Sequence, residues 1–184
     1  MTRLLLATSN PHKVDEVAVI LGDRFEVEAR DPAIEETGTT FEENALLKAR
    51  ALAAATGELA VADDSGIEID HLGGAPGIHS ARWTEEPDWI PRVLRELGGV
   101  PVEARGCRYV CAAAAVWPDG REEVVRGTVE GRIASEPRGT GGFGYDPIVE
   151  PTEGDGRTFG ELAPDEKQAI SHRARAFRQL ALVL

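Results

Sequence analysis

Short apolar runs alternate with stretches of helical periodicity along the chain, and this alternation predicts an α/β fold. Apolar or strictly alternating residues predict strands at 3–7, 25–29, 59–62, 67–70, 108–117 and 122–133. Apolar residues at helical spacing predict helices at about 11–21, 41–56, 88–97 and 164–184. Within the last of these, Ser171 interrupts the pattern and is expected to restart the helix as an N-cap.

The apolar run 59–62 leads directly into Asp63, Asp64, Ser65 and Gly66. We expect the strand to stop at the two carboxylates, and ligands of open α/β sheets lie just beyond the carboxyl ends of strands. Two carboxylates suit a metal ion better than a bare anion. Successive strand residues face opposite sides, so only one of the two aspartates is expected to face a given ligand. The alternative is that both are solvated turn formers.

The first strand is followed by the loop 8–13, in which Asn10 is a good N-cap and Pro11 a good first helical residue. A helix N-terminus with Lys13 in its first turn resembles a phosphate cradle. The glycines of a P-loop are missing. An ordinary capped helix is the alternative interpretation.

Two further stretches have both a structural and a functional interpretation. Residues 40–43 have the spacing of a capping box, so Glu43 either caps its own helix or helps to hold a metal beside Asp64. The glycine-rich loop 139–147 either lets a flat base approach Phe143 or Tyr145, or is a flexible turn with core aromatics.

Composition narrows the functional classes. The chain has 184 residues, enough for one domain, and its net charge of −12 argues against nucleic acid or an anionic membrane as a partner. Lysine is scarce, since Lys13, Lys48 and Lys167 are the only ones, and a compact ammonium is a natural phosphate partner. Cys107 and Cys111 fit no zinc pattern and, as free thiols, fit a reducing cytoplasm. No apolar run approaches the length of a membrane span.

Six stretches together resemble one family, the Ham1-like inosine triphosphate pyrophosphatases, also known as dITP/XTP pyrophosphatases. They are 8–13, 40–45, 62–66, 73–83, 141–147 and 167–173, in the family's order and over nearly the whole chain. Each is weak alone, and the six together are a strong signal. The resemblance implies an α/β fold with a long mixed central sheet and helices on both sides. It also implies a single domain, 1–184, whose two lobes flank a nucleotide-binding cleft.

The resemblance implies hydrolysis of ITP, dITP and XTP to the monophosphate and pyrophosphate, with Mg²⁺ as cofactor, by a cytoplasmic enzyme that is usually a homodimer. Asp64 would be the general base and a metal ligand, and Glu43 the second metal carboxylate. The residues implied to contact substrate are Thr8, Ser9, Asn10, Pro11, His12, Lys13, Ser65, Phe143, Gly144, Tyr145, Asp146, Lys167, His172 and Arg173. A donor such as Arg173 or protonated His172 would favour a 6-oxo purine over adenosine.

Two other functions stay open. A non-catalytic nucleotide-binding protein on the same fold would lack a catalytic acid, and none is missing in this sequence. The related Maf-like pyrophosphatases act on other nucleotides. A substrate panel of ITP, XTP, dUTP and modified UTP separates these classes.

Overall fold

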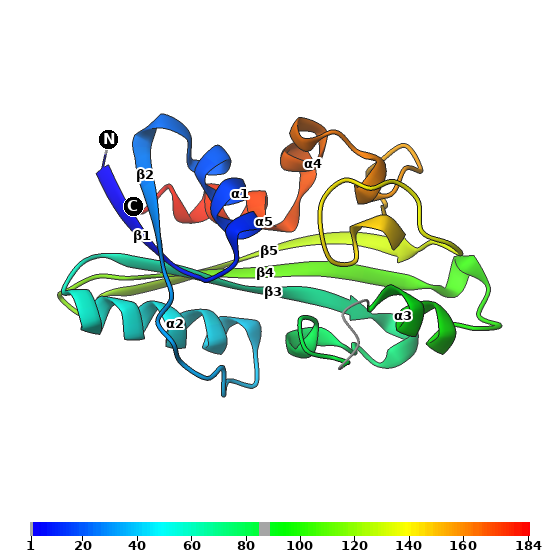
Figure 1. Ribbon diagram of the computed structural model, residues 1–184, viewed down its shortest axis with the longest axis horizontal. Coiled ribbons are helices and arrows are strands. Elements are labelled where there is room, and N and C mark those ends of the chain that lie inside the picture. The colour runs from blue at the N-terminus through cyan, green and yellow to red at the C-terminus, as the bar shows by residue number, and fades with distance from the viewer. Residues whose placement is uncertain (1, 85–88) are drawn as a thin grey trace. The chain divides into compact units, whose positions relative to one another are not determined.

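The computed structural model describes residues 2–84 and 89–184, which contain one six-stranded mixed sheet (Figure 1). The strands are β1 (Thr2–Ala7), β2 (Phe25–Arg30), β3 (Ala60–Ile69), β4 (Gly106–Val116), β5 (Glu122–Ile133) and β6 (Val149–Pro151). Their order is β2-β1-β3-β4-β5-β6. β1 pairs in parallel with β2 and β3, whereas β5 and β6 are antiparallel. The expected mixed α/β sheet is therefore confirmed.

Among the helices of the described ranges, the first two have clear capping residues. The helices are α1 (Pro11–Leu21), α2 (Phe41–Thr56), α3 (Ile90–Glu96), α4 (Pro164–Ile170) and α5 (His172–Leu180). The Asn10 side chain accepts the His12 N–H at 3.0 Å, as its N-cap position predicts. Gly57 ends α2 in the left-handed region, with φ 69°, and its N–H donates to the Ala53 carbonyl. None of these helices is long and apolar enough to cross a membrane.

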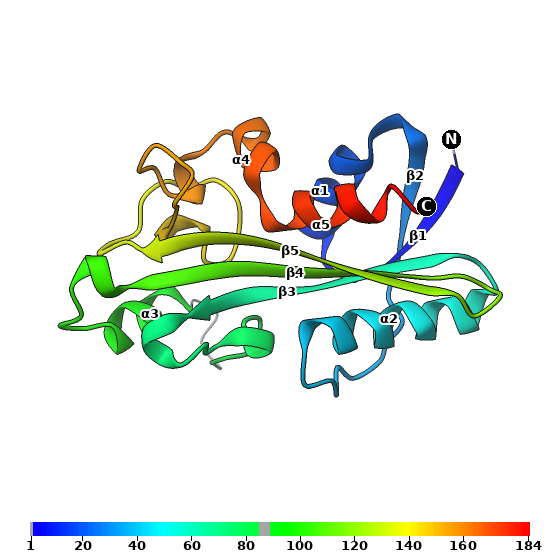
Figure 2. The same ribbon diagram turned by 180° about the vertical axis from the view of Figure 1, so that it is seen from behind.

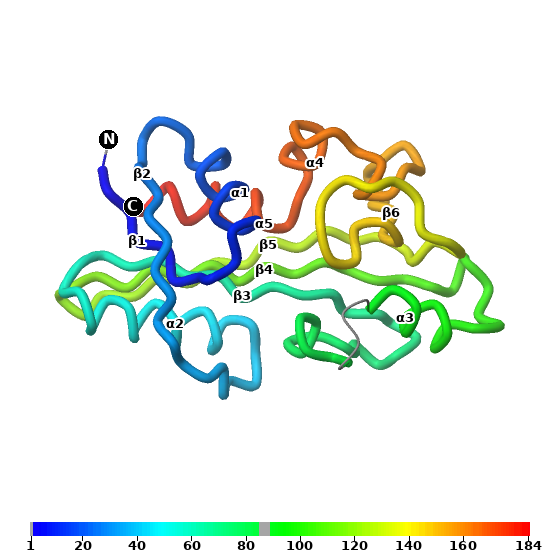
Figure 3. The backbone as a smooth tube through the Cα atoms, viewed as in Figure 1, coloured from blue at the N-terminus to red at the C-terminus, as the bar shows by residue number. Residues whose placement is uncertain are grey.

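Packing divides the chain into two compact units. The first consists of Met1–Ser65, Cys111–Gly127 and His172–Leu184, and the second of Gly66–Val110 and Thr128–Ser171. The long strands β3, β4 and β5 each contribute residues to both units, as the backbone trace shows (Figure 3).

In the first unit, α1 and α5 cover one face of the sheet and α2 covers the other (Figures 1 and 2). Its core residues are almost completely removed from solvent and include Leu4, Leu6, Val17, Val61, Cys111, Ala113, Phe177 and Leu180. The second unit has its own core, which includes Ile67, Ile69, Val93, Leu97, Tyr109, Ile148 and Phe159. Each set of polar site residues described below therefore rests on a packed apolar base.

One predicted strand boundary is wrong in the structure. The strands predicted at 59–62 and 67–70 are one strand, β3, which continues through Asp63 and Asp64. The prediction that the strand stops at the two aspartates, as a strand end or a turn, is wrong. Both side chains are buried and have polar partners, so the local preference of Asp-Asp-Ser-Gly for a turn is overridden. The helical stretch predicted at 164–184 is divided at Ser171 into α4 and α5, as the interrupted pattern predicts. The predicted start of the helix at 88 lies outside the described residues.

Candidate functional site

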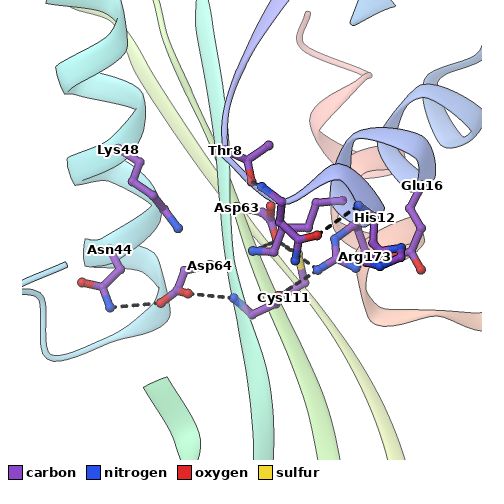
Figure 4. Close-up of polar contacts among 12 residues, drawn as sticks. Thr8, His12, Glu16, Asn44, Lys48, Asp63, Asp64, Cys111 and Arg173 are labelled. Carbon is purple, nitrogen blue, oxygen red and sulfur yellow. Dashed lines mark hydrogen bonds and ion pairs between the residues drawn. The ribbon is translucent and has the colours of Figure 1, made fainter. Parts of the chain in front are cut away.

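Asp63 and Asp64 are adjacent in β3, and their side chains lie on opposite faces of the strand (Figure 4). Asn44 and Lys48, both from α2, lie on the side of Asp64, whereas His12 and Arg173 lie on the other side. This arrangement bears out the expected alternation of the two aspartates. It gives the two carboxylates different surroundings, and their chemistry follows from those surroundings.

Asp63 is a buried counterion for two cations. Its Oδ2 lies 3.0 Å from the Lys13 ammonium and 3.3 Å from the Arg173 guanidinium. The Cys111 thiol also donates to Oδ2, at 3.8 Å. Burial alone would raise the pKa of Asp63, but Lys13 and Arg173 outweigh burial and hold that pKa well below its usual range. Asp63 is therefore a fixed anion that orients Lys13 and Arg173.

Asp64 has a different electrostatic environment. Burial raises the pKa of its carboxyl, the Lys48 ammonium opposes this, and the Glu36 carboxylate reinforces it, so that the net pKa is raised. Its Oδ2 accepts a hydrogen bond from Asn44 Nδ2 at 3.0 Å, and its Oδ1 accepts from the Ser65 N–H. Within the described residues no ion pair neutralises Asp64, and its pKa is raised, so Asp64 is the better proton acceptor of the two.

The loop 8–13 places polar groups beside Asp63 at the start of α1. The Asn10 N–H donates to Thr8 Oγ1 at 3.1 Å, which shapes the loop, while Ser9 and His12 are exposed. Lys13 projects from the first turn of α1 to Asp63. The loop thus brings backbone N–H groups, a helix N-terminus and an ammonium together, as a phosphate site requires.

Arg173 is almost completely enclosed, with 1% of its surface exposed. It donates to Ser65 Oγ at 2.8 Å and to Asp63, and it also forms an ion pair with Glu16. The neighbouring His172 is buried as well. The structure thus brings Lys13, Ser65 and Arg173 together around Asp63. The sequence analysis named Lys13, Ser65 and Arg173 as candidate site residues but did not predict these contacts.

Lys48 and Glu36 form an ion pair beside the aspartates, and the sequence interpretation assigned neither of them to the site. The Lys48 ammonium lies 2.5 Å from Glu36 Oε1 and points from α2 toward the strand that carries Asp63 and Asp64 (Figure 4). Burial lowers the pKa of Lys48, but the charges of Asp63 and Asp64 outweigh burial and raise it, so Lys48 is an ammonium. The scarcity of lysine was the available signal, because it marked Lys48 together with Lys13 and Lys167.

Glu43 forms contacts at its own helix terminus. Its carboxylate accepts the backbone N–H of Thr39 at 2.6 Å and the Thr39 hydroxyl at 2.9 Å. Its N–H donates to Thr40 Oγ1, the N-cap of α2. These hydrogen bonds lower the pKa of Glu43, first through the Thr39 N–H. The capping interpretation accounts for all of these contacts, and the role of Glu43 as a metal ligand stays a prediction.

The donor groups of the first unit are chemically suited to Mg²⁺. Mg²⁺ is typically held by one or two carboxylates together with substrate phosphates. Asp64 and Glu36 interact electrostatically, since the Glu36 charge contributes to the raised pKa of Asp64. No group of three or more His, Cys, Asp or Glu residues that could hold a metal occurs within 2–84 and 89–184.

The second unit contains a separate polar cluster around Asp146, which is 3% exposed. Its Oδ2 accepts from the Lys167 ammonium at 2.8 Å and from the Phe143 N–H at 2.9 Å, and its Oδ1 accepts from the Tyr109 hydroxyl at 3.0 Å. The Lys167 ammonium lies 4.7 Å from the centroid of the Phe143 ring. Asp146 therefore fixes a cation and an aromatic ring beside each other, which are the groups that a purine would need.

The two aromatic residues of the glycine-rich loop have different environments. Phe143 is partly exposed, and the adjacent Gly144 is exposed with φ 63°. Tyr145 is buried, donates its hydroxyl to the Ser80 carbonyl at 2.8 Å, and stacks on Trp89. Of the two, Phe143 is the ring that a ligand can reach, while Tyr145 has the contacts of a core residue.

Comparisons with known proteins agree on one family. Residues 4–183 match the model of the Ham1 family. The chain is 54% identical over 180 residues to a dITP/XTP pyrophosphatase of Symbiobacterium thermophilum, covering 95% of this chain and 90% of that protein. It is 50% identical to a dITP/XTP pyrophosphatase of Streptomyces coelicolor, covering 100% and 98%. The solved structure of a HAM1 protein from Coxiella burnetii matches with a TM-score of 0.87 and 39% identity, covering 100% and 98%.

Proposed function

The chain belongs to the Ham1 family, and from that premise we propose that it hydrolyses ITP, dITP and XTP to the nucleoside monophosphate and pyrophosphate. Relatives that match over nearly their full length carry the name dITP/XTP pyrophosphatase. The observation that carries the proposal is the difference in contacts between two adjacent carboxylates. Asp63 pairs with Lys13 and Arg173, whereas Asp64 accepts hydrogen bonds from the Asn44 amide and the Ser65 N–H.

In this proposal Asp64 accepts the proton of the water that attacks the α-phosphorus, and pyrophosphate leaves. A general base of this kind contributes about 10²–10⁴-fold to the rate. Lys13 and the loop 8–13, which includes Thr8, Asn10, Pro11 and His12, bind the triphosphate through an ammonium and backbone N–H groups. The contact between Lys13 and Asp63 supports this role, because it fixes the ammonium at the start of α1.

We propose that the cofactor is Mg²⁺ and that Asp64 and one further carboxylate would hold it. When bound, Mg²⁺ supplies neutralisation of the triphosphate charge and lowers the pKa of the attacking water. Glu43 is the carboxylate that the resemblance implies, whereas the electrostatic coupling to Asp64 supports Glu36. Glu36→Gln and Glu43→Gln separate the two, because loss of the carboxylate that binds the metal is expected to raise the Mg²⁺ concentration needed for half-maximal activity more than loss of the other.

For the nucleoside we propose Phe143 to Asp146 with Lys167, His172 and Arg173. Base stacking on an aromatic contributes about 1–3 kcal/mol, and the exposure of Phe143 supports it as that ring. The Lys167 ammonium donates to Asp146 in this structure, and an ammonium is also a suitable donor to a 6-oxo group. Arg173 already contacts Asp63 and Ser65, which supports an additional role in holding the site together.

We further propose that the protein is a homodimer and is located in the cytoplasm.

The deciding experiment is a product assay on the substrate panel with Mg²⁺. We expect one pyrophosphate for each ITP or XTP consumed, and little turnover of dUTP or modified UTP. Asp64→Asn is expected to abolish nearly all turnover while ITP still binds. Release of single orthophosphates, or a preference for the pyrimidine nucleotides, would contradict the proposal.

A further inference from the structure

Asn44 is a side-chain amide in the first turns of α2 that is completely buried. Phe41, Ala45 and Ala49 are buried on the same helix, so the amide lies on an apolar helix face. Buried polar groups are hydrogen-bonded as a rule, and Asn44 uses both ends of its amide. Its Nδ2 donates to Asp64 Oδ2 at 3.0 Å, and its Oδ1 accepts from the Gly38 N–H at 2.8 Å.

These two partners define the orientation of the amide. A backbone N–H can only donate, so the Asn44 oxygen faces Gly38. An ionised carboxylate can only accept, so the Asn44 nitrogen faces Asp64. An aspartate at position 44 would keep the first contact and place a second negative charge against Asp64. An aliphatic residue would lose both contacts.

The chain at Gly38 packs closely against α2. A Cβ atom at Gly38 would lie 2.6 Å from Asn44 Oδ1 and 2.8 Å from Glu43 Cβ, so a glycine is needed for this approach. Glu36, two residues earlier, pairs with Lys48, which is one helical turn beyond Asn44 on α2. Together with the hydrogen bonds from Thr39 to Glu43, these contacts attach the segment before α2 to the helix, and the contact at Asn44 also holds Asp64.

We propose that Asn44 is a positioning residue that fixes the Asp64 carboxylate and, through Gly38, the segment that carries Glu36. This rests on the proposed function, in which Asp64 is the general base and a metal ligand. Each oxygen of Asp64 has one hydrogen bond, from Asn44 and Ser65, which leaves acceptor capacity on both oxygens for water and metal. By fixing the orientation of the carboxylate, Asn44 determines which way the remaining acceptor lone pairs of Asp64 point. In this proposal Asn44 does not itself contact the substrate.

The proposal predicts a specific division of kinetic effects. Within the described residues Asn44 forms no hydrogen bond with Lys13 or the loop 8–13, so its loss is expected to leave triphosphate binding intact. We expect Asn44→Ala and the milder Asn44→Ser to lower kcat about 10–100-fold, in the range for residues that orient metal ligands, and to leave KM for ITP within about 3-fold.

A matched control lies at the same helix terminus. Thr40→Ala removes the N-cap hydroxyl of α2 and does not touch the Asn44 contacts. It is expected to lower Tm and to leave kcat unchanged. A general weakening of this end of α2 would lower kcat in Thr40→Ala as well, so the pair of variants separates positioning from stability.

A second measurement does not depend on turnover. Mn²⁺ is titrated into each protein in the presence of the α,β-imido analogue of ITP and followed by electron paramagnetic resonance. We expect the Mn²⁺ Kd to rise about 10-fold or more in Asn44→Ala and to be unchanged in Thr40→Ala. Gly38→Ala disturbs the hydrogen bond at the other end of the amide, so it is also expected to raise the Mn²⁺ Kd. The double variant Gly38→Ala with Asn44→Ala is expected to have a Mn²⁺ Kd close to that of Asn44→Ala alone.

Two results would overturn the proposal. One is an Asn44→Ala or Asn44→Ser protein whose kcat and Mn²⁺ Kd are both within 2-fold of the wild type. The other is a loss of kcat that Thr40→Ala reproduces. If the wild-type protein releases no pyrophosphate from ITP, the proposed function fails, and the Mn²⁺ titration still decides the role of Asn44.

Discussion

Asp63 and Asp64 are neighbours in the sequence, yet their replacement by asparagine is expected to have opposite consequences. Asp63→Asn removes the anion from a buried group that holds Lys13 and Arg173. Breaking a buried ion pair by removing one partner costs about 3–5 kcal/mol. Lys13 is 15% exposed and can turn to water, and Arg173 keeps Glu16, so we expect the lower end, about 3 kcal/mol.

Replacement of Asp64 by asparagine is not expected to lower the free energy of unfolding. The raised pKa of Asp64 means that folding disfavours its ionised form, so at pH 7 the charge of Asp64 reduces stability. A neutral amide of the same shape is therefore expected to leave the stability unchanged or to raise it. For a chain of this length, 3 kcal/mol lowers Tm by about 6–12 °C, and this drop is expected only in Asp63→Asn.

Thermal and urea unfolding followed by circular dichroism, at pH 7.5 with EDTA and without nucleotide, measure the difference. Glu122→Gln is the control, since it breaks an exposed pair with Arg50 and should lower Tm by at most about 4 °C. An Asp63→Asn protein within 3 °C of the wild type would refute the counterion role. So would an Asp64→Asn protein that loses as much stability as Asp63→Asn.

Three further predictions follow from single contacts. Lys13→Met is expected to raise KM for ITP about 10–100-fold, because it removes a hydrogen bond to a charged group of the substrate. An unchanged KM in steady-state kinetics would contradict the triphosphate role of Lys13. Burial raises the pKa of Cys107 to about 12 and that of Cys111 well above its usual range, so neither thiol should react with Ellman's reagent at pH 8 until the protein is unfolded. Because the folded state keeps these protons while the unfolded state loses them above about pH 8.5, stability should fall as the pH rises from there toward 12. Gly127→Ala would place a Cβ 2.1 Å from the His172 carbonyl oxygen, so we expect a loss of about 3 kcal/mol in urea unfolding.

The local parts of the structure could be predicted from the sequence. The cap of α1 at Asn10 and the ends of the β4–β5 hairpin follow from residues within a few positions of each other. The continuation of β3 through Asp63 could not be predicted from nearby residues, because Lys13 and Arg173 stabilise the charge of Asp63 from 50 and 110 positions away in the sequence. The partners of Asp64 were missed for the same reason. Asn44 is 20 positions from Asp64 and looks like any polar residue in the first turns of a helix.

The three lysines show why composition was nevertheless informative. In this arginine-rich chain, Lys13, Lys48 and Lys167 each contact a carboxylate, on Asp63, Glu36 and Asp146, and their side chains are only 10–15% exposed. Arginine is the usual choice for a permanent buried ion pair, because its fork matches a carboxylate with two hydrogen bonds. An ammonium has no such fixed geometry and can exchange a carboxylate oxygen for a phosphate or carbonyl oxygen with little rearrangement. Lysine at these three positions is thus consistent with cations that are held in place by acids and remain able to bind a ligand, which is what the proposed function requires of them.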